Sequence, residues 1–441
     1  MGGVVPKDAM TRDVMEPEVP APDGPASEGD VPGMAVPVVS GPGATVPAGR
    51  RLPWRSALVS ALLAGAGWGV WRFLEPRPEL AESLLGGGFH PELIRTLTRV
   101  TGLVPLPFAV AELLLVAVMV WVASLLVRAV REGRRTGAWP AASGRGGLRF
   151  LRGAGLLVFS FYFLWGWQYA RPGLDARLGF PPSGVVSDDE LEALGEALVT
   201  RTNALYLELH GFPDAGLPTA GPEGRSPSRT AHAGMNEAWE RVAARWDLPP
   251  AMARPRPGPR PLLTTPVLRR LGMAGVYAPW TGEALVMADL PGAGFHFTAA
   301  HESAHQRGIA RESDANAMAY LLALEAPSAE TRYSAALFLQ RQALRALARQ
   351  DPETVLRLVQ ARYPGVQRDV EAIAARARSV AGPAGDLARQ ANDAMLRRHG
   401  IADGVASYGG SLWIVAALAR DLGVETLLPP LEPQEPGAVL P

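Results

Sequence analysis

The sequence predicts a mostly helical α+β protein, in which three N-terminal transmembrane helices precede an extracytoplasmic domain with a small sheet. Three observations lead to this prediction. Long apolar runs recur within residues 54–169, helical periodicity fills most of the chain beyond them, and two short strand-like segments flank a turn at residues 280–283. A membrane domain followed by a separate water-exposed domain accounts for all three observations.

The N-terminal part of the chain is predicted to contain a tail and a membrane domain. Residues 1–50 are rich in Pro, Gly, Val and Ala without periodicity, which is typical of a disordered tail. The apolar runs 54–74, 105–127 and 148–169 are each about as long as a helix must be to cross a hydrocarbon core of roughly 30 Å. We therefore expect a membrane domain over residues 51–171 with three transmembrane helices.

The distribution of arginine predicts the orientation of this membrane domain. Arg50, Arg51 and Arg55 lie before or at the start of the first run, and seven further arginines lie over residues 128–152, between the second run and the first residues of the third. Between the first and second runs, arginine is balanced by glutamate. Positive residues are retained on the cytoplasmic side, so the N-terminus is expected there and three crossings leave residues 171–441 outside. The excess of arginine over lysine is typical of a GC-rich bacterium, and the expected location is therefore the inner membrane with a periplasmic C-terminal domain.

The domain over residues 172–427 is predicted to be helical around a small sheet. A Ser-x-x-Glu capping box at Ser187 begins a helix that runs to Leu209. The Pro/Arg-rich run 249–261 is expected to be irregular, and segments 275–278 and 284–288 are typical of the two strands of a hairpin. Further helices are expected over residues 231–246, 330–350, 353–362, 366–398 and 404–421, and the Pro-rich segment 428–441 is expected to be a second tail.

One short motif, His-Glu-x-x-His, carries the chemistry of this domain. His301 and His305 are four residues apart, so on a helix both imidazoles lie on one face and can bind one metal ion. Glu302 lies beside the first histidine, where it can accept a proton from a water that the metal activates. Thr298 is expected to cap the start of this helix and Gly308 to end it in a left-handed turn. The pattern is typical of a zinc metallopeptidase.

A catalytic zinc ion requires a third protein ligand and an open position. Glu312, near the start of a second helix that runs to about Leu324, is the first choice. Asp314 points about 200° around that helix from Glu312 and is the alternative. Asn316 and Tyr320 share the face of Glu312, where they could orient a ligand or contact a substrate. Candidates for stabilising the oxyanion of a tetrahedral intermediate are Tyr277, Tyr333 and Tyr408.

The segment Glu312-Ser313-Asp314-Ala315-Asn316 resembles the Glu-x-x-Ala-Asp/Asn signature that follows His-Glu-x-x-His in the glutamate-zincins. That group includes membrane-embedded peptidases of the prenyl-protein-processing and heat-shock types. A metzincin would instead have a third histidine at the position of Arg311. Residues 54–425 as a whole resemble a bacterial family of multi-pass membrane proteins of unknown function with a predicted zinc-peptidase core. Besides the histidine motif, the residues that carry this resemblance are 271–283, Arg332-Tyr333-Ser334 and Ser407-Tyr408-Gly409.

The resemblance implies a zincin-like hydrolase domain and supplies no substrate. Together with the motif, it predicts a zinc-dependent peptidase that is anchored in a lipid bilayer and cuts a peptide or protein. The chain has no cysteine, so a zinc ion must be bound by histidine and carboxylate. Equal numbers of basic and acidic residues, 43 each, argue against a nucleic-acid partner. Two alternatives are a catalytically inactive zincin-like membrane protein that serves as an envelope scaffold or binds a partner, and a scaffold without metal.

Overall fold

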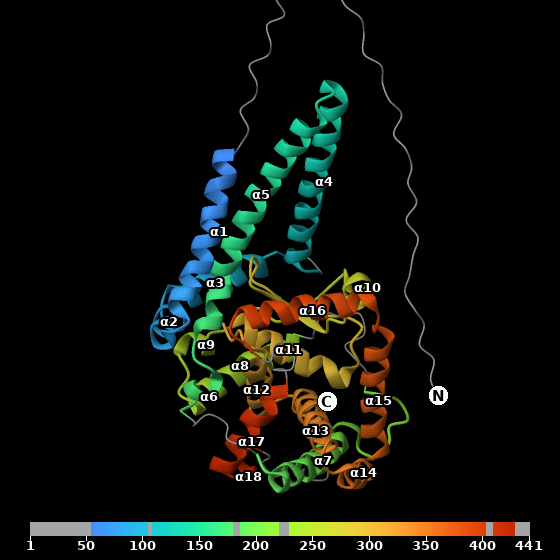
Figure 1. Ribbon diagram of the computed structural model, residues 1–441. Helices are drawn as coiled ribbons and strands as arrows, with labels where there is room; N and C mark the ends of the chain where they lie inside the picture. Colours follow the sequence, from blue (N-terminus) through green and yellow to red (C-terminus); the bar gives the residue numbers. More distant parts are fainter. Residues whose placement is uncertain (1–53, 105–107, 180–185, 220–228, 403–408, 428–441) are drawn as a thin grey trace, which may run out of the picture. The chain divides into compact units, whose positions relative to one another are not determined.

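The computed structural model describes residues 54–104, 108–179, 186–219, 229–402 and 409–427 (Figure 1). The two predicted tails and Tyr408 lie outside these ranges. Within them the chain is mostly helical and contains a three-stranded sheet, which confirms the mostly helical α+β class.

Three helices are long and apolar enough to cross a membrane: α1 (Trp54–Leu74), α4 (Val110–Thr136) and α5 (Trp139–Leu164). Helix α5 packs against both α1 and α4 (Figure 1). Many of their leucine, valine and phenylalanine side chains are exposed, as expected of helices whose surroundings are lipid. They confirm the prediction of three candidate membrane-spanning helices and indicate a membrane protein.

The connection between α4 and α5 is shorter than the sequence predicts. Instead of a loop over residues 128–147, both helices continue through the arginine-rich segments and leave only Gly137 and Ala138 between them. Gly137 has φ 67° and ends α4 in a left-handed turn, with its amide donating to the Gly133 carbonyl. Arginine is a good helix former, so a helix can continue through a cluster of arginines that marks a membrane boundary. The helix that contains the third predicted run therefore begins at Trp139 rather than 148, and it ends at Leu164 rather than 169.

Short helices connect the membrane-spanning helices to the rest of the chain. Helices α2 (Pro78–Leu85) and α3 (Phe89–Gly102) follow α1, and the 3₁₀ helix η1 (Gly166–Ala170) and α6 (Leu174–Arg177) follow α5. Arg171 donates from Nε and Nη2 to the two carboxylate oxygens of Glu82, at 2.8 and 2.7 Å. This bidentate pair joins α2 to the chain that leaves the third span.

The C-terminal domain is built around packed helices. Helix α11 (Gly292–Gln306) packs against α12 (Glu312–Leu324) and α13 (Ala329–Leu347), and α7 (Asp188–His210) packs against α13. Ser187 and Glu190 form the predicted capping box at the start of α7. The remaining helices are α8 (Arg229–Arg245), α9 (Pro250–Ala253), α10 (Thr265–Leu268), η2 (Arg269–Leu271), α14 (Pro352–Gln360), α15 (Pro364–Ser379), α16 (Pro383–Arg398), α17 (Gly410–Leu422) and α18 (Val424–Leu427).

The sheet has the strand order β1-β3-β2. Strands β2 (Gly275–Ala278) and β3 (Glu283–Val286) pair antiparallel, which confirms the predicted hairpin, and β1 (Arg260–Pro261) pairs parallel to β3. The run 249–261, predicted to be irregular, thus contributes both α9 and β1. Helix α11 packs against β3 and β2, so the sheet lies beside the helix that carries the histidine motif.

Two further predicted helix boundaries are wrong. Helix α11 begins at Gly292, so Thr298 does not cap it, and the Thr298 hydroxyl donates to the Gly294 carbonyl within the helix at 2.9 Å. Proline at position 291 already has the φ value of a helix start, which explains the earlier beginning. The single helix predicted over 366–398 is divided into α15 and α16, because Gly382-Pro383 interrupts it.

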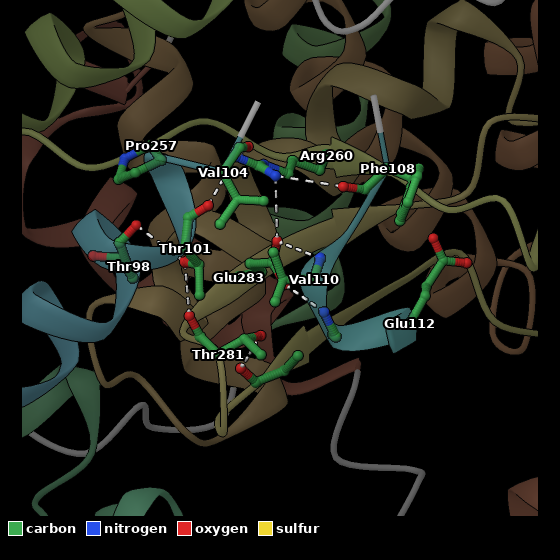
Figure 2. Close-up of polar contacts among 12 residues, drawn as sticks. Thr98, Thr101, Val104, Phe108, Val110, Glu112, Pro257, Arg260, Thr281 and Glu283 are labelled. Carbon is green, nitrogen blue, oxygen red and sulfur yellow. Dashed lines mark hydrogen bonds and ion pairs between the residues drawn. The ribbon is translucent and has the colours of Figure 1, made fainter. Parts of the chain in front are cut away.

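The sheet is joined to the start of α4 by a buried carboxylate (Figure 2). Glu283 of β3 accepts hydrogen bonds from the amides of Val110 and Ala111, at 2.9 and 2.8 Å. The first amides of a helix have no partners within the helix and form its positive end, so a carboxylate is stabilised there. Arg260 of β1 lies 3.7 Å from the same carboxylate. The sheet is therefore held at the end of a candidate membrane-spanning helix.

Candidate metal centre

The two histidines of the motif and Glu312 come together across a tight turn between α11 and α12. Gly308 has φ 84°, a left-handed conformation that a residue with a side chain rarely adopts, and its amide donates to the His305 carbonyl at 2.9 Å. The predicted left-handed turn at Gly308 is thus confirmed. The chain reverses there, and α12 begins four residues later with Glu312 in its first turn.

The three side chains form a compact donor set. Glu312 Oε2 lies 3.1 Å from His301 Nε2 and 3.5 Å from His305 Nε2. One ligand atom from each of the three residues lies within 4.8 Å of the other two. Two imidazole nitrogens and one carboxylate oxygen are the ligands that a catalytic zinc ion commonly has. The donor set therefore fits zinc in both chemistry and spacing.

A backbone carbonyl and an aromatic side chain hold the imidazole ring of His305 in one orientation. His305 Nδ1 donates to the Ile309 carbonyl at 2.6 Å, so in the neutral ring the lone pair is on Nε2, which faces Glu312. A backbone carbonyl in this position is a common partner of metal-binding histidine. Trp165, from the end of the third span, lies edge-on to the same ring at 5.5 Å between centroids.

Glu302 lies beside this donor set in a dry environment. The residue is 4% exposed, and its Oε2 atom is buried without a hydrogen-bond partner among the described residues. Burial raises the pKa of Glu302 to about 7. On the other side lies Gly275 of β2, where a Cβ atom would overlap the Glu302 carboxylate. Glu302 is therefore packed between α11 and the edge strand of the sheet.

The other candidate residues occupy different places. Asp314 is not in the donor set, because its Oδ2 accepts a hydrogen bond from the Leu174 amide at 3.0 Å. Asn316 is buried on α12. Tyr320 is buried in the helical core, and its hydroxyl donates to the Leu427 carbonyl. The Tyr333 hydroxyl donates to Asp369 at 2.7 Å, within a separate apolar cluster.

Residues 87–414 match the model of a family described as "Protein of unknown function (DUF3810)". The chain belongs to this family. The match begins just before α3 and includes two of the three candidate spans, the sheet and the whole donor set. Searches for similar curated proteins and for similar solved structures found no match. The description of the DUF3810 family names no activity, so a function must be argued from the site.

Two aromatic residues near the donor set of this DUF3810 chain were not among the sequence-based candidates. Trp165 lies against both Tyr277, at 4.8 Å between ring centroids, and the His305 ring, at 5.5 Å. Burial and the nearby Glu312 carboxylate raise the pKa of Tyr169 above its ordinary value, which keeps the phenol protonated. Both residues lie at the end of the apolar run 148–169, which the sequence identifies only as a predicted transmembrane helix.

The charges of the donor set predict how zinc binding depends on pH. Burial favours neutral His305, but the adjacent Glu312 carboxylate, together with Glu302 and the Ile309 carbonyl, outweighs burial and raises the His305 pKa to about 9. The two imidazoles in turn hold the pKa of Glu312 below its ordinary value, against the effect of burial. We therefore expect His305 to carry a proton at pH 7 in the metal-free protein, which a bound metal would displace.

Apparent zinc affinity is expected to rise by about tenfold per pH unit from about pH 7 to pH 9, and to level off above the His305 pKa. Competition with a chromophoric chelator of known pH dependence measures this affinity in the full chain. An affinity that does not change between pH 7 and 9 would mean that His305 is already neutral in the metal-free protein.

Proposed function

We propose that this chain is a membrane-anchored, zinc-dependent peptidase. One observation supports the proposal above the others: two imidazole nitrogens and a carboxylate oxygen converge next to a buried glutamate that is in contact with an edge strand. His301, His305 and Glu312 would hold the zinc ion. When bound, zinc supplies a Lewis acid that polarises a substrate carbonyl and makes a water molecule more acidic.

Glu302 would be the proton carrier of the reaction. It adjoins His301 in the chain, has one carboxylate oxygen that is not engaged by the described residues, and is shielded from solvent. A carboxylate in such a place can accept a proton from the attacking water and pass it to the leaving amine. Among the predicted oxyanion stabilisers, Tyr277 has the position closest to this role, because it shares a cavity lining with His305.

The sheet offers a place for an extended peptide. Strand β2 pairs with β3 on one side, and no strand in the described part of the chain pairs with its other side. An extended substrate could therefore add to β2 as a further strand, which would carry its backbone past Glu302. Main-chain hydrogen bonds would supply affinity in this arrangement with little dependence on sequence.

Gly275→Ala is expected to reduce peptide hydrolysis by about 10²-fold while zinc binding is kept, because a Cβ atom there would displace the Glu302 carboxylate. Initial rates and bound zinc would be measured on the same preparation. Gly294→Ala on α11 is the matched control, since its Cβ would make only ordinary contact with Ile373, at 3.7 Å. Unchanged hydrolysis in Gly275→Ala would mean that the position of Glu302 against β2 is unimportant.

The proposed orientation places the metal centre outside the cytoplasm. The hydrogen bonds Arg171–Glu82 and Glu283–Val110 link the connection between α1 and α4 to the part of the chain that follows α5. These contacts support a location of both parts on the same side of the membrane. The α4–α5 connection would then lie on the opposite side, and the arginines around it support a cytoplasmic location for that side.

A reporter that is active only in the periplasm should be active when fused after Arg171 and silent when inserted at Gly137. The reporter activity of both fusions, normalised to their amounts, measures the orientation. The reverse pattern would place the metal centre in the cytoplasm.

The purified full chain is the appropriate material for testing the function. Trp165 and Tyr169 precede the C-terminal domain yet pack with Tyr277, so a fragment that begins after them would lack part of the site. The proposal expects stoichiometric zinc and hydrolysis of an unfolded protein substrate. Zinc without hydrolysis would favour an inactive partner-binding protein, and the absence of zinc from every preparation would favour a scaffold without metal.

A further inference from the structure

Helix α3, in the connection between α1 and α4, has an exposed apolar stripe along one side. Phe89, Val100 and Leu103 are 55%, 58% and 81% exposed. Together with the half-buried Leu93 they are spaced by four, seven and three residues, so the four side chains share one side of the helix. Large apolar side chains that stay exposed together are typical of a surface that another apolar body covers.

A different side of α3 is buried against the turn between β2 and β3 (Figure 2). The Thr101 hydroxyl donates to the Thr281 carbonyl at 3.0 Å. Thr98 lies so close to Gly282 that a Cβ atom there would overlap its methyl group. Leu103 is two residues from Thr101, which places it about 200° around the helix. The stripe therefore faces away from the sheet.

Helix α3 begins beside the end of the third candidate span. His90 Nε2 donates to the carbonyl of Leu164, the last residue of α5, at 3.1 Å. Phe89 of the stripe stacks on Phe163 of α5, with 6.1 Å between ring centroids. The stripe is thus continuous with the surface of a helix that is long and apolar enough to cross a membrane.

Helix α3 ends beside the start of α4 (Figure 2). Arg260 donates to the carbonyls of Thr101 and Phe108, at 3.2 and 3.4 Å, and so holds the two chain segments together. Only 15 residues of α4 lie between the charged Glu112 and Arg128, which is about 22 Å of helix. A hydrocarbon core is roughly 30 Å thick, so when α4 crosses it, the boundary of the core lies at or beyond the start of α4.

We propose that α3 lies along the surface of the lipid bilayer, with its apolar stripe inserted among the acyl chains on the side of the membrane that holds the C-terminal domain. A helix in this position buries its apolar side about 5–10 Å into the boundary between headgroups and acyl chains. Arg99, exposed beside Val100, lies where its guanidinium can reach lipid phosphate groups. Because α3 also holds the β2–β3 turn, this contact fixes how far the sheet stands from the membrane. It does not depend on whether the metal centre is catalytic.

Spin labels test the contact site by site, because the chain has no cysteine and an introduced one is unique. Labels on Val100→Cys and Leu103→Cys, in the full chain in lipid nanodiscs, should be reached by oxygen dissolved in the lipid and not by a water-soluble nickel chelate. Their depth should be about 5–10 Å inside the headgroup boundary. Leu356→Cys is the matched control, since Leu356 is 60% exposed on α14, which packs against α7 and α13. Its label should be reached by the nickel chelate.

Two results of this experiment would overturn the proposal. The nickel chelate could reach the labels at positions 100 and 103 as freely as the control label, which would mean that water covers the stripe. Alternatively, neither reagent could reach them, with two labels of neighbouring copies close enough for a dipolar distance measurement. A second copy of the chain would then cover the stripe instead of lipid. Thermal unfolding of each labelled variant, compared with the natural protein, shows that the fold is kept.

A photoreactive lipid gives a check that needs no variant. A lipid with the reactive group on its acyl chain should, after illumination, attach to residues 89–103 of the natural protein as well as to α1, α4 and α5. Mass spectrometry of the digested protein locates the attached lipid. Attachment to the three long helices without any to α3 would contradict the proposal.

Discussion

Replacing Glu302 by glutamine is expected to lower peptide hydrolysis by at least about 10²–10⁴-fold and to leave bound zinc unchanged. Glutamine has almost the same volume, so it fits the space between α11 and Gly275 that the carboxylate occupies. It cannot accept a proton from the attacking water. Since burial already disfavours the charged form of Glu302, the neutral amide should not destabilise the fold.

The comparison requires hydrolysis of an unfolded protein substrate, bound zinc and thermal unfolding, all measured on the same full-chain preparations. Glu330→Gln is a suitable control, because Glu330 is a carboxylate on α13 that accepts a hydrogen bond from Ser328 and does not belong to the donor set. Loss of zinc from Glu302→Gln would assign Glu302 a ligating or structural role. Undiminished hydrolysis would mean that the histidine motif is not the catalytic centre.

Local patterns were sufficient to predict most of the elements. The first span, the α7 capping box and the β2–β3 hairpin follow from apolar length, a Ser-x-x-Glu spacing and a turn between two short strands. The placement of Glu312 rather than Asp314 beside the histidines follows from helical periodicity, because the two side chains leave α12 in different directions. Each of these features depends on residues that are close in the sequence.

The surroundings of the candidate site could not be predicted in this way. Trp165 reaches His305 from a chain segment 140 residues away, and Gly275 contacts Glu302 from a strand whose pairing is set by β3. In the sequence, Trp165 is one of several aromatic residues in an apolar run. Its environment comes from tertiary packing, for which a single sequence contains no periodic signal.

Alanine at His301, His305 or Glu312 is expected to lower zinc affinity by more than about 100-fold, since even loss of a residue that only orients a ligand costs 10–100-fold. Hydrolysis should fall with it in each variant. The three ligand atoms lie within 4.8 Å of one another, so the removal of any one leaves two donors for the ion. Bound zinc after dialysis against a chelator of graded strength measures the loss.

Asp314→Asn is the matched control for the carboxylate ligand, because Asp314 lies two residues from Glu312 and is equally part of α12. Its Oδ2 accepts from the Leu174 amide and its Oδ1 from the Ser313 hydroxyl, so the variant should lose thermal stability while it retains zinc. Asparagine keeps the size of the side chain, and its amide oxygen can preserve one of these bonds. Loss of zinc from Asp314→Asn together with its retention by Glu312→Ala would mean that the other face of α12 binds the metal. The proposed position of Glu302 beside the metal would then also be wrong.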